Sequence, residues 1–296
     1  MLLLFAPLGQ EPPLRNASFR TIRRMLEMMG QAMDPDREVD LEELRRLGMD
    51  ERTAERILRR LGMETELEKL LDTLSRLHIT AITRISPAYP GRLREKLGDR
   101  APMVLYCAGN LDLLYKRGIA LVGSRKLREP GARFARTAGE QIAAQGYVYV
   151  SGGAAGADTE GFHAAVQNGG AGLLFLADSL QGAMADYEAE LRENRVALVS
   201  EDGYNAGFSI ARAYARNRLI HAMGELVLVA QSDYGAGGTW QGTVENLKHD
   251  WSPVYVSNLE PEDPGSRGLL ERGCQSVCLE ELADLDSLQR TQTVLY

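Results

Sequence analysis

The chain has 296 residues, of which 44% are hydrophobic and 25% are charged, proportions typical of a folded globular protein. Its 34 Lys and Arg residues are outnumbered by 41 Asp and Glu residues, and the net charge of −7 argues against a protein that coats nucleic acid non-specifically, though not against a local basic groove. Because no apolar run reaches the length of a membrane span, and because Cys107, Cys274 and Cys278 form neither a disulfide framework nor a zinc motif, we expect a cytoplasmic protein with no membrane association, metal or cofactor.

Residues 1–80 are rich in Arg, Glu, Leu and Met and predict a small all-helical domain. Residues 40–48 and 50–62 each begin at an Asp that suits a helix N-cap and end at a Gly that suits a helix C-terminus. Residues 65–77 have the apolar spacing of an amphipathic helix, and residues 19–29 predict an earlier one. Helices joined by a short turn sometimes grip a DNA backbone, and a packing or dimerisation role is the more common alternative.

Residues 81–117 predict a connecting segment packed on a sheet, with one short strand at 103–106. Between residues 118 and 286 apolar runs alternate with helical segments, and residues 287–296 predict a C-terminal tail. The apolar runs are uninterrupted, as in parallel strands that are covered on both faces. We therefore predict a doubly wound, mostly parallel α/β sheet of the extended Rossmann-like type. The expected strands are 119–122, 147–151, 172–176, 197–201, 226–230 and 253–257, and the expected helices are 130–145, 158–168, 183–194, 210–223 and 238–249.

Glycine-rich turns follow three of the expected strands. Turns that follow parallel strands open on one edge of a sheet, and small residues there let backbone N–H groups approach an anion. Asp158, at the end of the second turn, is expected to cap the helix that follows. The sequence therefore predicts a crevice for phosphates. Its candidate residues are Gly123, Ser124, Arg125 and Lys126 in the first turn, Ser151, Gly152, Gly153, Gly156 and Asp158 in the second, and Gly238 and Thr239 in the third.

The densest basic segment of the α/β region is residues 212–220. Arg212 and Arg216 share a helix face, Asn217 follows, and Arg218 lies off to one side. The segment contains no acidic residue, which weakens the alternative of a solvated helix face, and Tyr214 offers a stacking face for a base. The chain contains neither GxxxxGK[ST] nor a GxGxxG that opens the first βα unit, so a P-loop ATPase and ordinary NAD binding are unsupported.

In their order and spacing these motifs resemble the DprA/Smf family, the bacterial DNA-processing proteins of natural transformation. The resemblance extends from about Ile82 to Cys278, and many family members also carry a helical N-terminal domain. It implies an extended Rossmann-like domain that dimerises, binds single-stranded DNA in a positive pocket and hands it to a RecA-type recombinase, without catalysis. It also implies residue roles. Ser124, Arg125, Lys126 and the Gly152–Gly156 backbone would contact phosphate, Arg216 and Arg218 would shape the pocket, and Asn217 would help to order the loops.

The chain departs from the family pattern at several positions and resembles a divergent member. Ala155 stands where the family usually has an Arg, and Gln231 stands where a Glu is usual. Ser257-Asn258 replaces an expected Pro-Gly, and no segment of winged-helix size follows Leu285. The missing cation at position 155 predicts a weaker contact with DNA.

The main alternative is a related nucleotide-binding enzyme. Residues 238–245 resemble the GG-x-GT-x-x-E loop of the LOG-type nucleoside-monophosphate phosphoribohydrolases, in which the Glu, here Glu245, assists cleavage of an N-glycosidic bond. That family also pairs Arg with Lys on the preceding helix, whereas this chain has Arg216-Asn217. A scaffold or partner-binding role is the third alternative.

Overall fold

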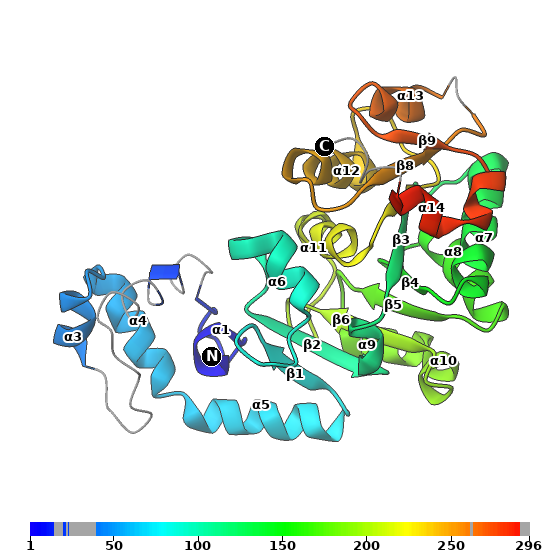
Figure 1. The fold of residues 1–296 in the computed structure, drawn as a ribbon. Coiled ribbons are helices and arrows are strands. Elements are labelled where there is room, and N and C mark those ends of the chain that lie inside the picture. Colours follow the sequence, from blue (N-terminus) through cyan, green and yellow to red (C-terminus); the bar gives the residue numbers. More distant parts are fainter. Residues whose placement is uncertain (15–19, 22, 24–39, 261–262, 291–296) are drawn as a thin grey trace. The chain divides into compact units, whose positions relative to one another are not determined.

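The computed structural model describes residues 1–14, 20–21, 23, 40–260 and 263–290 (Figure 1). The chain divides into two compact units, one formed by Met1–Tyr89 with Gly98–Leu105 and the other by Pro90–Leu97 with Tyr106–Tyr296. The helix expected at 19–29 lies largely outside the described residues. Within those that are described, no helix has both the length and the apolar character that a bilayer span requires.

The first unit is mainly helical, as the sequence predicts. The Asp40 and Asp50 carboxylates accept the N–H groups of Glu43 and Thr53 at 2.8 and 2.9 Å, so both expected N-caps are present. Gly48, between the two capped helices, has φ of +78°, a left-handed conformation that suits glycine. The elements are α1 (Leu2–Phe5), α3 (Leu41–Arg46), α4 (Glu51–Leu61), α5 (Glu64–Arg76), the strand β1 (Thr80–Thr83) and the 3-10 helix η1 (Gly98–Arg100).

The sheet has nine strands in the order β1-β2-β6-β5-β4-β3-β7-β8-β9. The pairs from β6 through β9 are parallel, and β2 runs antiparallel to β6. Every residue of β3, β4, β6 and β8 is buried, as the uninterrupted apolar runs predict. The strands are β2 (Val104–Gly109), β3 (Gly118–Val122), β4 (Val148–Ser151), β5 (Ala171–Phe175), β6 (Val196–Ser200), β7 (Val227–Val229), β8 (Val254–Ser257) and β9 (Gln275–Val277).

Helices cover both faces of the sheet, with α7 and α8 on one face and α11 and α12 on the other (Figure 1). The doubly wound, mostly parallel fold predicted from the sequence is therefore confirmed. The helices are α6 (Gly91–Leu97), α7 (Glu129–Ala144), α8 (Ala157–Gln167), α9 (Leu180–Asp186), α10 (Glu188–Arg192), α11 (Ile210–Met223), α12 (Gly237–His249), α13 (Pro264–Leu270) and α14 (Leu285–Arg290), with 3-10 turns η2 (Leu111–Leu114) and η3 (Glu280–Ala283).

One expected helix, 183–194, is instead two short helices, α9 and α10. The backbone leaves helical geometry at Tyr187, which has φ of −110° and ψ of 27°. The Tyr187 ring packs edge-on against Phe162 of α8, with ring centroids 5.4 Å apart. This tertiary contact occurs at the break between α9 and α10. Residues 183–194 contain no Gly or Pro from which the break could have been predicted. At the other end of the chain, the described part of the expected tail, residues 287–290, is the end of α14.

The chain order of the strands reverses between β3 and β7. Successive strands β3 to β6 extend to one side of this point, and β7 to β9 extend to the other. Val122 lies beside Val229 in the parallel register, so both strands end at the same level. In open α/β sheets the helices diverge on either side of such a point and leave a crevice at the carboxyl ends of the strands.

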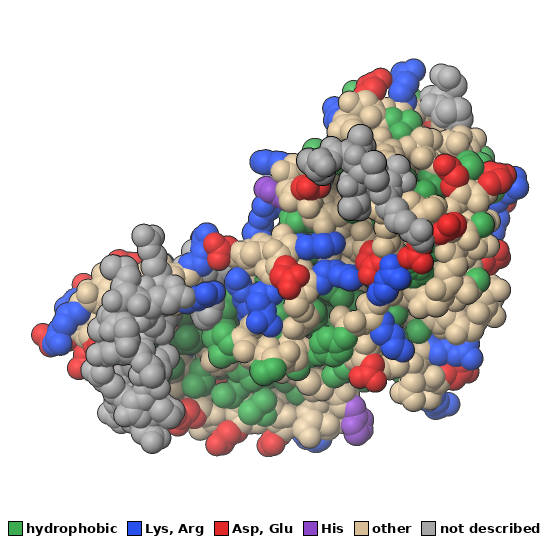
Figure 2. All heavy atoms as spheres, viewed as in Figure 1, with side chains coloured by type: hydrophobic (Ala, Val, Ile, Leu, Met, Phe, Trp, Pro, Cys, Tyr) green, Lys and Arg blue, Asp and Glu red, His purple; other side chains and the backbone are tan. Residues whose placement is uncertain are grey.

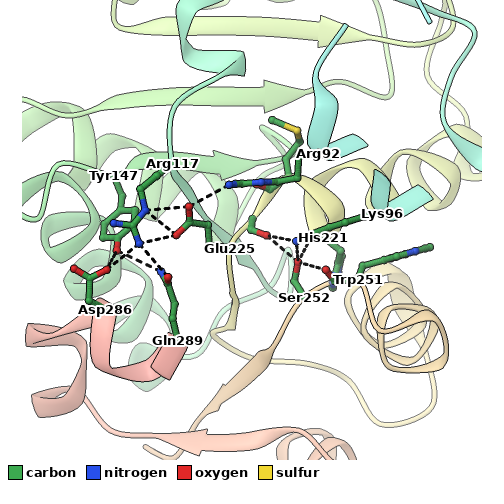
Figure 3. A network of polar contacts seen from close by, with 12 residues as sticks. Arg92, Lys96, Arg117, Tyr147, His221, Glu225, Trp251, Ser252, Asp286 and Gln289 are labelled. Carbon is green, nitrogen blue, oxygen red and sulfur yellow. Dashed lines mark hydrogen bonds and ion pairs between the residues drawn. The ribbon is translucent and has the colours of Figure 1, made fainter. Parts of the chain in front are cut away.

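The opposite edge of the sheet, where β3 and β7 begin, is closed by a polar network (Figure 3). Arg117 donates to both carboxylate oxygens of Glu225 at 3.0 Å and to Asp286 of α14 at 2.9 Å. Arg92 of α6 donates to Glu225 at 3.1 Å. The network therefore joins α6, α14 and the starts of two central strands. It also includes Lys96, Tyr147, Ser252 and Gln289.

Candidate nucleic-acid interface

A cleft of about 610 Å³ opens at the carboxyl ends of β3 and β7. Its walls are the turn after β3, the loop that leads into α12, and one face of α11. The structure brings nine of the predicted site residues to this cleft: Gly123, Ser124, Arg125, Lys126, Asp158, Arg216, Asn217, Gly238 and Thr239. The other six, Ser151, Gly152, Gly153, Gly156, Arg212 and Arg218, do not line it.

The turn after β3 is held in shape by the amide side chain of Gln231. The Gln231 Oε1 atom accepts the Arg128 N–H at 2.9 Å, and its Nε2 atom donates to the Lys126 carbonyl at 3.3 Å. The Ser124 N–H donates to the Gln231 carbonyl at 2.9 Å. A carboxylate could accept but not donate, so the amide is suited to both contacts. Sequence reasoning noted Gln231 only as a departure and missed this positioning role.

The second glycine turn packs directly beneath the first. Gly156 has φ of +87°, and a Cβ atom there would lie 2.4 Å from the Ser124 carbonyl oxygen. The Ala157 N–H donates to that same carbonyl at 3.3 Å. Gly156 is therefore required both by its backbone conformation and by the close approach of the two turns.

The prediction that Asp158 caps α8 is wrong. The helix begins at Ala157, its N-cap is Gly156, and Asp158 occupies the second helical position. The Asp158 Oδ2 atom instead accepts the N–H groups of Gly152 and Ala154 at 3.1 and 3.2 Å. These two backbone donors are thus already bound to a carboxylate of the chain, in the manner expected for a phosphate.

Asp158 is buried beside the guanidinium of Arg216. Burial raises the pKa of Asp158, while the charge of Arg216 and the two backbone N–H groups act in the opposite direction. Burial likewise lowers the pKa of Arg216, against the attraction of Asp158. A buried carboxylate and a buried guanidinium in one place stabilise each other's charged forms.

Arg216 fits behind the second turn because Gly152 has no side chain. A Cβ atom on Gly152 would lie 1.5 Å from the Arg216 Nη1 atom. That same nitrogen donates to the Phe175 carbonyl at 2.7 Å, whereas the Arg216 Nε atom has no hydrogen-bond partner among the described residues. Arg216 is only 5% exposed, so it supplies positive charge to the cleft from below rather than an open side chain.

Two of the predicted cations are already paired with acids. Arg218 forms a two-pronged contact with the Glu201 carboxylate, and one of its bonds measures 2.7 Å. Arg212 lies 3.5 Å from Asp202 and donates to the Gly207 carbonyl. The basic segment is free of acids in the sequence, but the loop before α11 supplies them in space.

Arg125 and Lys126, in contrast, are available to bind an anion. Both side chains are exposed, and neither has an acidic partner within the described part of the chain. The Arg125 guanidinium lies 5.4 Å from the centroid of the Phe208 ring, and Phe208 is 52% exposed at the cleft. An exposed cation beside an exposed aromatic ring is a suitable surface for the phosphate and the base of a nucleotide.

The third glycine turn leads into α12, and the residues at the start of this helix, 236–239, line the cleft. The N-cap is Ala236, which offers no side-chain cap, and Gly237 has φ of +81°. Asn217 of α11 donates to the Gly238 carbonyl at 3.0 Å and thereby orders the turn. An uncapped helix N-terminus attracts anions through its free N–H groups and its dipole.

His221 is a buried residue at the cleft that sequence reasoning missed. Neither ring nitrogen has a hydrogen-bond partner within the described chain, and burial lowers the pKa of His221 to about 3, so the ring is neutral. Glu245, which carries the hydrolase alternative, lies on α12 but does not line the cleft. Among the residues that the structure describes, no group of His, Cys, Asp and Glu is arranged to hold a metal ion.

The family model and two curated relatives identify one family. The family model for DNA recombination-mediator protein A matches residues 80–284. The DNA processing protein DprA of Streptococcus pneumoniae is 30% identical over 201 residues, which cover 65% of this chain and 69% of that protein. Protein Smf of Synechocystis is 29% identical over 219 residues, which cover 70% of this chain and 54% of that protein.

Solved structures of this family share the fold. The X-ray structure of DprA from Streptococcus pneumoniae matches with a TM-score of 0.68 and 24% identity, over 87% of this chain and 89% of that one. DprA from Helicobacter pylori, whose structure was reported for its single-stranded DNA binding mode, matches with a TM-score of 0.58 and 23% identity, over 74% of this chain and 97% of that one.

Proposed function

This chain belongs to the DNA recombination-mediator protein A family, which includes DprA and Smf, and from that membership we propose that its cleft binds single-stranded DNA. The observation that carries the proposal is the pair of exposed cations, Arg125 and Lys126, on a glycine-walled cleft opposite the uncapped start of α12. Like charges brought together in this way favour an anion between them.

The proposed contacts divide between phosphates and bases. Arg125, Lys126 and the first N–H groups of α12 bind phosphate oxygens, and the buried Arg216 adds positive potential from below. Phe208 and Tyr214 offer apolar faces to the bases. Neither kind of contact distinguishes one base from another, so the proposed binding depends little on DNA sequence.

Family membership supports a proposal for the wider role. We propose that the protein works in the cytoplasm as a homodimer, protects incoming single-stranded DNA and delivers it to a RecA-type recombinase. The proposed activity is binding rather than catalysis. Two acidic residues, Asp158 and Asp233, are among the described residues that line the cleft. The support is that the buried one, Asp158, is engaged by two backbone N–H groups instead of being poised to activate a nucleophile.

The test is a binding titration with single-stranded DNA, duplex DNA and nucleoside monophosphates at several salt concentrations. Wild-type protein should prefer the single strand. The double variant Arg125→Ala/Lys126→Ala should bind more weakly and reduce the slope of log K against log salt by about 1.4, because two phosphate contacts are lost. The matched control is Arg133→Ala, which removes an exposed arginine of α7 away from the cleft. An unchanged slope, or release of free base from a nucleotide, would contradict the proposal.

A further inference from the structure

The helical first unit contains a second basic hollow that the cleft does not explain. Its volume is about 410 Å³, and it is lined by Arg52, Arg56 and Arg59 of α4 with Glu11, Pro12 and Pro13. The three arginines are spaced at i, i+4 and i+7, which puts them on one face of the helix. The opposite face buries Ala54 and Ile57, so this basic face is turned away from the core of the unit.

The hollow has a fixed wall. Beneath it, Arg60 is fully buried and donates to four carbonyl groups of the N-terminal segment, those of Leu3, Ala6, Glu11 and Pro12, at 2.5 to 3.0 Å. Arg56 donates to the carbonyls of Pro12 and Pro13 at 3.2 and 3.5 Å. These bonds hold the proline segment against α4, so the hollow belongs to the folded unit.

The arginines of this unit differ in their partners. Arg45 and Arg46 are paired with Glu51 and Glu42, the latter at 2.8 Å. Arg52 and Arg59 are exposed, and neither forms an ion pair or hydrogen bond with any residue that the structure describes.

Positive charges outnumber negative charges among the residues that line the hollow. Glu11 lies 3.7 Å from Arg56, at the inner edge of the hollow. Glu55 is exposed beside Arg59 on α4 but forms no ion pair with it within the described chain. Asp50, the N-cap of α4, is attracted to the charge of Arg52 in addition to its hydrogen bonds with Thr53. Among the described residues that line the hollow itself, three arginines face one carboxylate, that of Glu11.

We propose that the Arg52–Arg56–Arg59 face of α4 is a second nucleic-acid contact, which binds the phosphodiester backbone of a DNA strand. A guanidinium presents a planar fork that matches two oxygens of a phosphate. From Arg52 to Arg59 the helix rises by about 10 Å, the length occupied by about three phosphates of one strand in a duplex. No aromatic ring is among the described residues that line the hollow, so the face reads the backbone and not the bases.

The test uses the full chain and the double variant Arg52→Ser/Arg59→Ser. Its matched control is Arg45→Ser/Arg46→Ser, which changes the net charge equally on the same helix pair but removes arginines that are already paired. Binding of single-stranded DNA is measured by anisotropy at several salt concentrations. The Arg52/Arg59 variant should reduce the slope of log K against log salt by about 1.4, and the control should leave it nearly unchanged.

The same substitutions are then made in the Arg125→Ala/Lys126→Ala background. The proposed face adds phosphate contacts to those of the cleft, so replacing Arg52 and Arg59 in this background should weaken the residual binding further and lower the slope by about 1.4 again. An unchanged slope of log K against log salt in the Arg52/Arg59 variant, or an equal reduction of that slope in the control, would overturn this proposal. The proposal that the cleft binds DNA would still stand. Competition by poly-glutamate that depends on Arg52 and Arg59, with DNA binding unaffected, would assign the face to an acidic protein instead and would also overturn the proposal for α4.

Discussion

At the scale of single residues, substitution of Phe208 tests the proposed contacts with bases separately from those with phosphates. Its ring is 52% exposed at the cleft and lies next to the Arg125 guanidinium. Stacking on an aromatic ring contributes about 1–3 kcal/mol per base, so Phe208→Ala should weaken binding of an ordinary oligonucleotide by roughly fivefold to more than a hundredfold. Phe208→Tyr should retain most of the affinity.

An abasic oligonucleotide of the same length provides the control for Phe208. It keeps every phosphate but offers no base to stack, so its affinity should be the same for wild-type protein and for Phe208→Ala. Equal losses with both oligonucleotides would mean that Phe208 acts only by positioning Arg125.

His221 gives the fold a dependence on pH at one residue. Burial lowers the pKa of His221 to about 3, whereas the unfolded chain has an ordinary value of about 6.5. Between these values the unfolded state binds the additional proton, so the free energy of unfolding falls as the pH falls. We expect a loss of about 2 kcal/mol between about pH 7 and 5 from this group.

The measurement is urea unfolding across that pH range. His221→Leu should flatten the profile, because the variant has no imidazole to protonate in the unfolded chain. His163→Leu, which replaces an exposed histidine of α8, is the matched control and should keep the wild-type slope. A His221→Leu profile as steep as that of the wild type would show that other groups cause the pH dependence.

At the scale of elements, the second glycine turn and α11 fit together through Gly152 and Arg216. A methyl group at position 152 would overlap the Arg216 guanidinium, which is buried and cannot simply swing into water. We expect Gly152→Ala to lower the free energy of unfolding by about 3 kcal/mol or more, because it displaces a buried charge from its partners.

The control for this glycine is Gly182→Ala on α9, where a Cβ atom would meet only Ser179 atoms at 3.5 and 3.6 Å. There the change should be neutral or slightly stabilising through helix propensity. Urea unfolding of Gly152→Ala, Arg216→Met and the double variant completes the comparison. Additive effects of the two substitutions would contradict the packing argument, since residues in contact should show coupling.

Elements also show how much of this molecule the sequence could predict. Uninterrupted apolar strands and post-strand glycines were enough for the central parallel strands, the crevice and the position of Arg125 and Lys126 beside it, because these signals are local. The edge strands β1 and β9 were not predicted. The ion pair of Arg218 with Glu201 was not predictable in this way, because Glu201 lies on the preceding loop and contacts Arg218 only in the folded chain. Asp158 was misassigned because the same acidic residue suits a cap or a loop acceptor, and the start of α8 at Ala157 decides between them.

At the scale of the whole molecule, the net charge of the chain does not set the charge of the cleft, because acidic and basic side chains are mixed over the surface. Figure 2 shows acidic and basic side chains interspersed over one face. Several arginines are paired with nearby acids, such as Arg136 with Glu129 and Glu160. The net charge of −7 is therefore compatible with open cations at Arg125 and Lys126, and local charge rather than total charge decides where a polyanion binds.

The network at the far edge of the sheet should control stability without affecting ligand binding. Burial alone would raise the pKa of Glu225, but hydrogen bonds and charges from Arg117 and Arg92 outweigh it and hold the pKa below its usual value. Glu225→Gln keeps the size of the side chain and leaves the two guanidinium groups without a counter-charge at that position (Figure 3). At neutral pH we expect a loss of about 1–3 kcal/mol in the free energy of unfolding.

The pH dependence of that loss identifies its origin. A carboxylate with a lowered pKa stabilises the fold above its unfolded value, and this stabilisation disappears as the pH falls through the folded value. The difference between wild type and Glu225→Gln should therefore shrink in acid. Glu140→Gln, an exposed acid of α7, should behave as wild type throughout. Because the network lies at the strand edge opposite the cleft, the affinity of Glu225→Gln for single-stranded DNA should match that of wild type. A loss of affinity in a variant that remains folded would mean that this edge is coupled to the cleft through β3 and β7.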